Sequence, residues 1–127
     1  MVSENKQLND TKRMKEETVT MYRPCNQAEL DLVVESGNKR LPPRLPGQPI
    51  FYPVTNEQYA KEVNAWNKKD FSKGYVTKFE VNKSFVEKYD IQKVGGNYHT
   101  EWWIPAEDLE ILNDNRVGLI EAVDVLE

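Results

Sequence analysis

The stretch "TNEQYAKEVNAWN" (residues 55–67), closely followed by "YVTKFEV" (residues 75–81), decides the fold class. In the first segment Tyr59, Val63 and Trp66 recur at spacings of four and three residues, the pattern of one face of an α-helix. We therefore expect a helix here, with Trp66 as a buried anchor of the core. The second segment alternates apolar and polar residues, which predicts a half-buried strand. A helix followed by such a strand indicates a mixed fold.

Strand and helix signals also alternate on the N-terminal side of this pair. Thr55 is the predicted cap of the helix, with Gln58 three residues later. Asn26 caps an earlier predicted helix, which Gly37 closes. Pro53 cannot donate to a strand ladder, so its strand is expected at an edge or a bulge. The predicted elements on this side are a strand (18–24), a helix (26–37), an extended proline-rich loop (41–49) and a short strand (50–54).

The C-terminal side continues with short elements. They are a short helix (82–90), a strand (91–94), a glycine turn (95–96), a strand (100–104), a helix (105–112) and a last strand (117–126). Pro105 is expected at the first position of its helix, where its missing N–H costs nothing. Short strands among clustered helices indicate an α+β fold rather than a strictly alternating parallel sheet. We predict a single α+β domain over residues 19–127, after a disordered or loosely helical tail over residues 1–18.

The length and the composition limit the number of domains and the class of the protein. The chain has 127 residues, 39% of them hydrophobic, which suits one domain with a modest core. A net charge of -4 gives no basic surface for nucleic acid, and no run is long enough for a membrane span. The N-terminus lacks the apolar segment of a secretory signal. The single cysteine, Cys25, cannot form an internal disulfide, so we predict a cytoplasmic protein. One cysteine and one histidine cannot supply the ligands of a zinc site, so we predict no metal.

The segment "GGNYHTEWWIP" (residues 95–105) holds the only histidine and two of the three tryptophans. Glu101 either lines a cleft, where it could orient a hydroxyl or stabilise a developing cation, or faces solvent from an ordinary strand. His99 shares a strand face with Glu101 and is either a proton carrier or a surface residue near a turn. Because adjacent strand residues face opposite sides, we expect one of Trp102 and Trp103 in the core and the other beside the cleft.

Other candidate binding residues lie earlier in the chain. Arg23 sits in an otherwise apolar strand, where it holds a phosphate or carboxylate, lies on an exposed strand face, or pairs with an acid at the core edge. Arg44 could reach a phosphate from its rigid loop, and its segment "PPRLP" also resembles a ligand for proline-binding domains. Tyr52 and Tyr59 bracket a strand-to-helix turn, where they could sandwich a planar ligand or belong to the core. Cys25 has no base near it in the sequence and is not a candidate nucleophile.

Nearly all of the domain resembles a set of small, uncharacterised bacterial proteins. The resemblance runs through "MYRPCNQAELDLVVESG", "PPRLPGQPIFYPVTNEQYA" and "GGNYHTEWWIPAEDL". Some of these proteins carry a label that refers to ADP-ribosylation and to a lens crystallin. The ADP-ribosyl hydrolases related to that crystallin are larger, all-helical, metal-dependent enzymes, unlike this short and strand-rich chain. The segment order is instead similar to the ADP-ribosyltransferase fold. That fold has a split β core, mixed or antiparallel, with a few short helices, and holds NAD in a cleft.

The resemblance implies roles for residues at three motifs. Tyr22 and Arg23 stand at the first motif, where Arg23 would hold the NAD phosphates. The segment "YPVTNEQY" stands at the second, where Thr55 or Tyr59 would shape the nicotinamide pocket. Glu101 stands at the third, where it would bond the ribose and assist the loss of nicotinamide. The candidate NAD-binding residues are therefore Tyr22, Arg23, Arg44, Tyr52, Thr55 and Tyr59, and the candidate catalytic residues are Glu101 and His99.

The chain also departs from these motifs. The second motif lacks its usual pair of serines, and His99 stands where the arginine-modifying subtype has a second acid. The implied function is an NAD-dependent ADP-ribosyltransferase that cleaves the nicotinamide–ribose bond and transfers ADP-ribose to an unknown acceptor. The alternative is a non-catalytic interaction or accessory protein that keeps the fold without the chemistry. Arg23 and Glu101 converging on one cleft beside Tyr59 would favour the enzyme, and opposite faces would favour the alternative.

Overall fold

The computed structural model describes residues 17–127, which form an α+β arrangement of antiparallel sheets and short helices. Most of the predicted tail, residues 1–18, lies outside the described residues, and the first strand begins at Thr18. No helix in the described part has the length and apolar character needed to cross a membrane. In chain order the elements are β1 (Thr18–Cys25), α2 (Gln27–Glu35), β2 (Ile50–Phe51), α3 (Glu57–Phe71), β3 (Gly74–Asn82), α4 (Lys83–Val86), β4 (Ile91–Lys93), β5 (Thr100–Trp102), β6 (Ile104–Pro105), α5 (Leu109–Asp114) and β7 (Arg116–Leu126).

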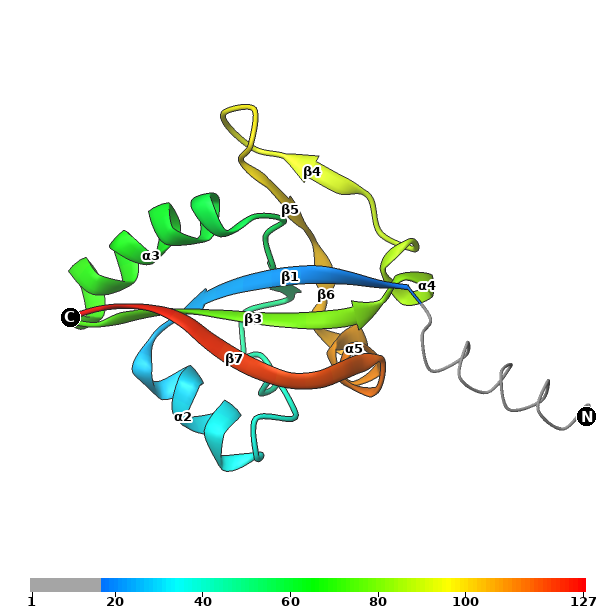
Figure 1. The fold of residues 1–127 in the computed structure, drawn as a ribbon, viewed down its shortest axis with the longest axis horizontal. Helices are drawn as coiled ribbons and strands as arrows, with labels where there is room; N and C mark the ends of the chain where they lie inside the picture. The colour runs from blue at the N-terminus through cyan, green and yellow to red at the C-terminus, as the bar shows by residue number, and fades with distance from the viewer. Residues whose placement is uncertain (1–16) are drawn as a thin grey trace, which may run out of the picture.

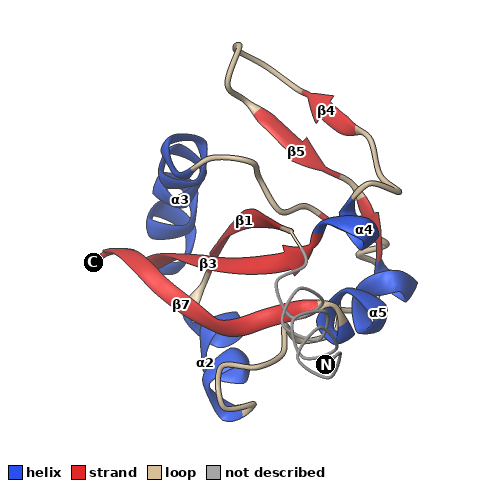
Figure 2. Ribbon diagram, turned by 45° about the vertical axis from the view of Figure 1, so that its right-hand side comes forward, coloured by secondary structure: helices blue, strands red, loops and turns tan. Residues whose placement is uncertain are grey.

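Three long strands form the centre of the molecule in the order β1-β3-β7, all antiparallel (Figure 1). Strands β4 and β5 form a hairpin that projects from this body (Figure 2). Val54 connects the two parts, because it bridges Tyr22 of β1 on one side and Glu101 of β5 on the other. The hairpin therefore continues the sheet beyond β1, through a single residue rather than a full strand.

The two faces of this sheet carry different groups. Directly paired residues of antiparallel strands project to the same face, so Tyr22, Val54 and Glu101 share one face. Helix α3 packs on that face through Ala60. Neighbouring residues of a strand project to opposite faces, so Arg23 projects away from Glu101. This division decides which predicted site residues can meet.

The opposite face covers the larger core. Trp102 belongs to this core with 4% of its surface exposed, whereas Trp103 is 45% exposed, which confirms that the two tryptophans divide between core and surface. The largest fully buried side chains of this core include Met21, Phe51, Phe79, Ile104, Leu112 and Ile120.

The prediction that Trp66 anchors the core is wrong. Trp66 is 63% exposed, and Nζ of Lys69 lies over its ring, 5.4 Å from the centroid. The buried residues of α3 are instead Ala60 and Asn64, which let the helix approach the sheet closely. Gly74 makes this approach possible, since a Cβ there would lie 2.3 Å from Oδ1 of Asn64.

The helix ends follow local chemistry, with two corrections. Asn26 caps α2 as predicted, by accepting a hydrogen bond from the backbone N–H of Glu29 at 2.9 Å. The cap of α3 is Asn56 rather than Thr55, because the Thr55 hydroxyl is bonded to Thr100 of β5. Pro105 belongs to the short strand β6, so it does not begin a helix; a 3-10 turn over residues 106–108 precedes α5.

Candidate functional site

Glu101 and its neighbours form a cluster between α3 and the β4–β5 hairpin, the glutamate cluster (Tyr59, Glu62, His99, Glu101 and Trp103). Oε1 of Glu101 accepts a hydrogen bond from the Tyr59 hydroxyl at 3.1 Å, and Oε2 accepts one from Nε1 of Trp103 at 2.7 Å. Burial and the Glu101 charge raise the pKa of Tyr59 to about 12, so it stays a neutral donor. Each carboxylate oxygen thus already has a protein partner.

His99 completes this cluster from the hairpin. Its ring stacks on Tyr59 with centroids 4.6 Å apart. Nδ1 accepts a hydrogen bond from the Gly96 backbone at 2.9 Å, which leaves the proton on Nε2, facing Glu62 at 3.0 Å. Gly95 is required here, because a Cβ at its position would lie 2.7 Å from Nδ1. Both ring nitrogens are engaged, so His99 has no free nitrogen to act as a general base in this arrangement.

Thr55 fixes the hairpin to the start of α3. Its backbone N–H donates to the carbonyl of Thr100 at 3.1 Å, and the two hydroxyls are hydrogen-bonded. Asn56 adds a bond from its side chain to the carbonyl of Tyr98 at 2.7 Å. The contacts around the glutamate cluster therefore hold the hairpin on the helix.

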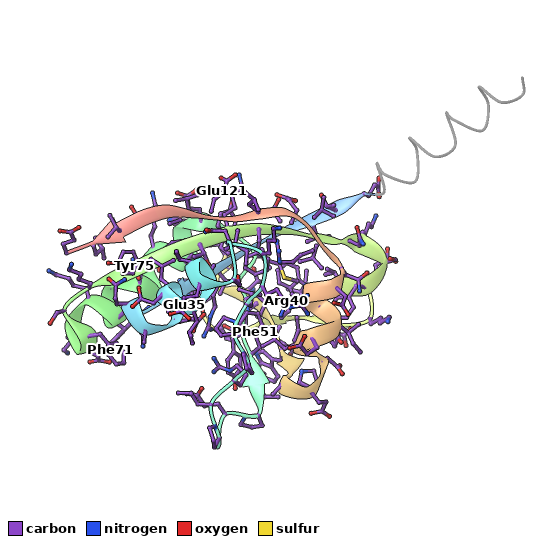
Figure 3. The ribbon with its side chains drawn as sticks, turned by 90° about the horizontal axis from the view of Figure 1, so that it is seen from below. Glu35, Arg40, Phe51, Phe71, Tyr75 and Glu121 are labelled. Atoms are coloured by element: carbon purple, nitrogen blue, oxygen red, sulfur yellow. The ribbon has the colours of Figure 1, made fainter. Side chains whose placement is uncertain are left out.

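A separate pocket of about 430 Å³ opens beside the end of β1, between α2, α3 and the proline-rich loop (41–49). We name it the arginine pocket, after Arg23 and Arg44 in its lining. Phe51 and Val54 form part of its wall. Phe51 of β2 and Phe71 at the end of α3, both labelled in Figure 3, line this pocket. Four of its lining side chains are large, apolar or aromatic, and exposed: Leu32, Leu45, Tyr52 and Phe71.

Arg23 is neutralised inside this pocket. Its Nε and Nη2 donate to the two carboxylate oxygens of Glu29, each at 2.9 Å. The side chains are only 13% and 18% exposed, respectively. Burial by itself would lower the pKa of Arg23, but the Glu29 carboxylate outweighs it and the pKa is raised. Of the three alternatives for Arg23, the ion pair with an acid is the one found.

Arg44 has a different environment. Its Nε donates to the carbonyl of Ile50 at 3.1 Å, and its guanidinium lies 6.0 Å from the centre of the Phe51 ring. Arg23 lies over the same ring at 4.9 Å. Burial, and then the nearby Arg23 charge, lower the pKa of Arg44. No carboxylate of residues 17–127 forms an ion pair with Arg44, so the two arginines and Glu29 leave the pocket one positive charge.

Cys25 also lines the pocket, on the same face as Arg23. The thiol is buried, and burial, followed by the Glu29 charge, raises its pKa to about 12. A protonated thiol is a poor nucleophile, in agreement with the interpretation of the sequence.

The candidate residues fall into two groups. Thr55, Tyr59, His99 and Glu101 come together around the glutamate cluster, and Tyr22 shares their face of the sheet. The other candidates, Arg23, Arg44 and Tyr52, line the arginine pocket.

The two groups also come into contact with each other. The ring of Tyr52 meets that of Trp103 edge-on, with centroids 6.5 Å apart. Glu101 does not line the arginine pocket, and Arg23 projects from the other face of the sheet. The structure therefore does not bring Arg23 and Glu101 into one cleft.

Sequence reasoning missed Glu29, Leu32 and Phe71 of the arginine pocket. The one signal for Glu29 was an acid just inside the helix that follows the Arg23 strand. Leu32 and Phe71 gave no signal, because apolar residues in helices are ordinarily assigned to the core.

Comparisons with protein-family models, curated proteins and solved structures found no match for this chain. The described residues contain no group of three or more potential metal-ligating His, Cys, Asp or Glu side chains. The geometry of the two groups is therefore the basis for a proposed function.

Proposed function

We propose that the protein is a non-catalytic binding module that takes a small amphipathic molecule in the arginine pocket. The observation that carries this proposal is the exposed apolar lining of a pocket that also contains two arginines. Exposed apolar side chains gathered in one concave place, with few polar groups among them, are typical of ligand sites. A volume of about 430 Å³ lies within the range of small-molecule sites.

The chemistry of the lining favours binding over catalysis. Cys25 is held as a thiol, and Glu29 is occupied by both of its bonds to Arg23. Neither is free to act as a nucleophile or a base. This proposal corresponds to the accessory-protein alternative, and it gives that alternative a site.

A neutral fluorescent probe tests the proposal without relying on charge. N-phenyl-1-naphthylamine brightens when it enters an apolar site, and we expect the parent protein to bind it. Phe71→Ser removes an exposed ring from the pocket and should weaken the binding. Leu119→Ser is the matched control, because Leu119 is similarly exposed on β7 and does not line the pocket. Equal binding by both variants, or none by the parent, would contradict the proposal.

A second candidate function is the NAD-dependent ADP-ribosyl transfer that the sequence resemblance implies. The hydrogen bond between Tyr59 and Glu101 supports it, since a carboxylate beside an aromatic donor suits an oxocarbenium-like state. In this proposal Glu101→Gln, which keeps the shape and removes the charge, abolishes nicotinamide release from NAD. A parent protein that releases no nicotinamide and binds no NAD at millimolar concentration would exclude this function.

A further inference from the structure

We infer that the ligand of the arginine pocket is a free organic monocarboxylate with an apolar body, bound head-first at Arg44. This inference rests on the proposed binding function and adds the chemical class of the ligand.

The donors left for a ligand belong mainly to Arg44. Arg23 already donates hydrogen bonds to Glu29 through Nε and one terminal nitrogen. Within residues 17–127, Arg44 donates only through Nε, to the carbonyl of Ile50. Its two terminal nitrogens form an end-on fork, and the two oxygens of a carboxylate match such a fork. Arg44 is therefore the group best placed to recognise a planar anionic head.

The charge balance selects a single negative charge. Two arginines and one glutamate leave the pocket one positive charge. A monocarboxylate neutralises this charge and gives Arg44 a counter-charge. Arg44 needs one, because burial and the nearby Arg23 charge lower its pKa. A phosphate dianion would exceed this balance and would be repelled by the carboxylate of Glu29. The pocket is accordingly suited to a carboxylate rather than to a phosphate.

The remaining lining selects an apolar body. Phe51 and Val54 lie on its inner side, and the exposed side chains of Leu32 and Phe71 lie toward solvent. A ligand with its head at Arg44 would cover these groups with its own carbon atoms, and their removal from water favours binding. A volume of about 430 Å³ suits a whole small molecule. For this reason we assign a free acid rather than the carboxyl end of a polypeptide.

A calorimetric series of four ligands, three of which share a phenylalkyl body, tests the inference. The ligands are 4-phenylbutyrate, its neutral amide, 4-phenylbutyl phosphate and a pentapeptide that ends in phenylalanine. We expect the acid to bind about tenfold more tightly than the amide, as a charge-assisted hydrogen bond implies. The phosphate should bind no more tightly than the acid, and the peptide should bind more weakly.

Three variants identify the group responsible. Arg44→Gln should bring the acid down to the affinity of the amide and leave the amide unchanged, and Arg44→Lys should fall between the two. Arg40→Gln is the matched control, because Arg40 pairs with Glu110 and Asp114 outside the pocket and should change nothing. Parent-like melting temperatures establish that each variant is folded.

Several results would overturn the inference. Equal affinity for acid and amide, tighter binding of the phosphate, or binding of the peptide as tightly as the acid would each do so. An acid that fails to bind while N-phenyl-1-naphthylamine still binds in a Phe71-dependent way would overturn the carboxylate inference alone. If neither the acid nor N-phenyl-1-naphthylamine binds, the carboxylate inference and the proposed function are both wrong.

Discussion

Replacing Glu29 by Gln breaks the ion pair between Arg23 and Glu29 while keeping the size of the side chain. The two hydrogen bonds that hold the pair, both 2.9 Å long, lie between groups that are 13% and 18% exposed. The substitution leaves the charge of Arg23 buried without its counter-charge. The free energy of unfolding should therefore fall.

The structure sets the size of this loss. Breaking a buried ion pair by removing one partner costs about 3 to 5 kcal/mol. Because some solvent reaches both side chains, we expect roughly 3 kcal/mol for Glu29→Gln, the low end of that range. The exposed pair between Arg40 and Glu110 is the matched control, with exposures of 43% and 70%. Glu110→Gln should cost about 0 to 1 kcal/mol, as surface pairs do.

Urea unfolding followed by tryptophan fluorescence measures both variants. The double variant Arg23→Met with Glu29→Gln should regain most of the lost stability, because it removes the unpaired charge. Two results would refute the reasoning: a loss for Glu29→Gln no larger than that for Glu110→Gln, or a double variant less stable than Glu29→Gln alone.

The remaining predictions concern packing and pH. Gly74→Ala should lower the free energy of unfolding in urea by about 1 to 3 kcal/mol, because the new Cβ overlaps Asn64. A stability equal to that of the parent would show that α3 and β3 can move apart at this position. Trp102→Ala should cost about 3 to 5 kcal/mol and Trp66→Ala less than about 1 kcal/mol, since one ring is buried and the other exposed; the reverse order in urea midpoints would contradict the described packing. The folded-state pKa of Cys25, about 12, lies above its ordinary 9.0, so its contribution to stability is complete below pH 9 and declines as the pH rises toward 12. Between pH 8 and 10.5 the parent should lose about 2 kcal/mol more than Cys25→Ala, and parallel pH profiles of the two proteins would count against this.

Features set by neighbouring residues could be predicted from the sequence. The cap at Asn26 depends on one side chain and the N–H three residues later. The division of Trp102 and Trp103 follows from the alternation of strand faces, and it holds although β5 is only three residues long. The α+β class follows from the same kind of local signal.

Features set by packing could not be predicted in this way. The apolar spacing in α3 predicted that Trp66 is buried. The buried residues of α3 are instead the small Ala60 and, one turn later, Asn64. Thr55 and Asn56 are both good caps, and a contact with the distant Thr100 decides between them. A helix pattern states which residues share a face and does not state which face meets the sheet.

The candidate site shows the same limit. Its residues were found in large part, but their grouping depends on the pairing of Tyr22 and Glu101 with Val54. That pairing fixes the faces of the sheet and so separates Arg23 from Glu101. The arginine pocket joins residues of β1, α2, the proline-rich loop, β2 and α3, and its apolar lining resembles core in sequence.

The most direct test of the central claim is amide chemical-shift mapping by NMR during titration with 4-phenylbutyrate. The claim is that ligand binding belongs to the arginine pocket and not to the glutamate cluster. We predict saturable shifts at Cys25, Leu32 and Phe71, with little change at His99 and Glu101. Shifts concentrated at His99 and Glu101, with none around the arginine pocket, would contradict the claim.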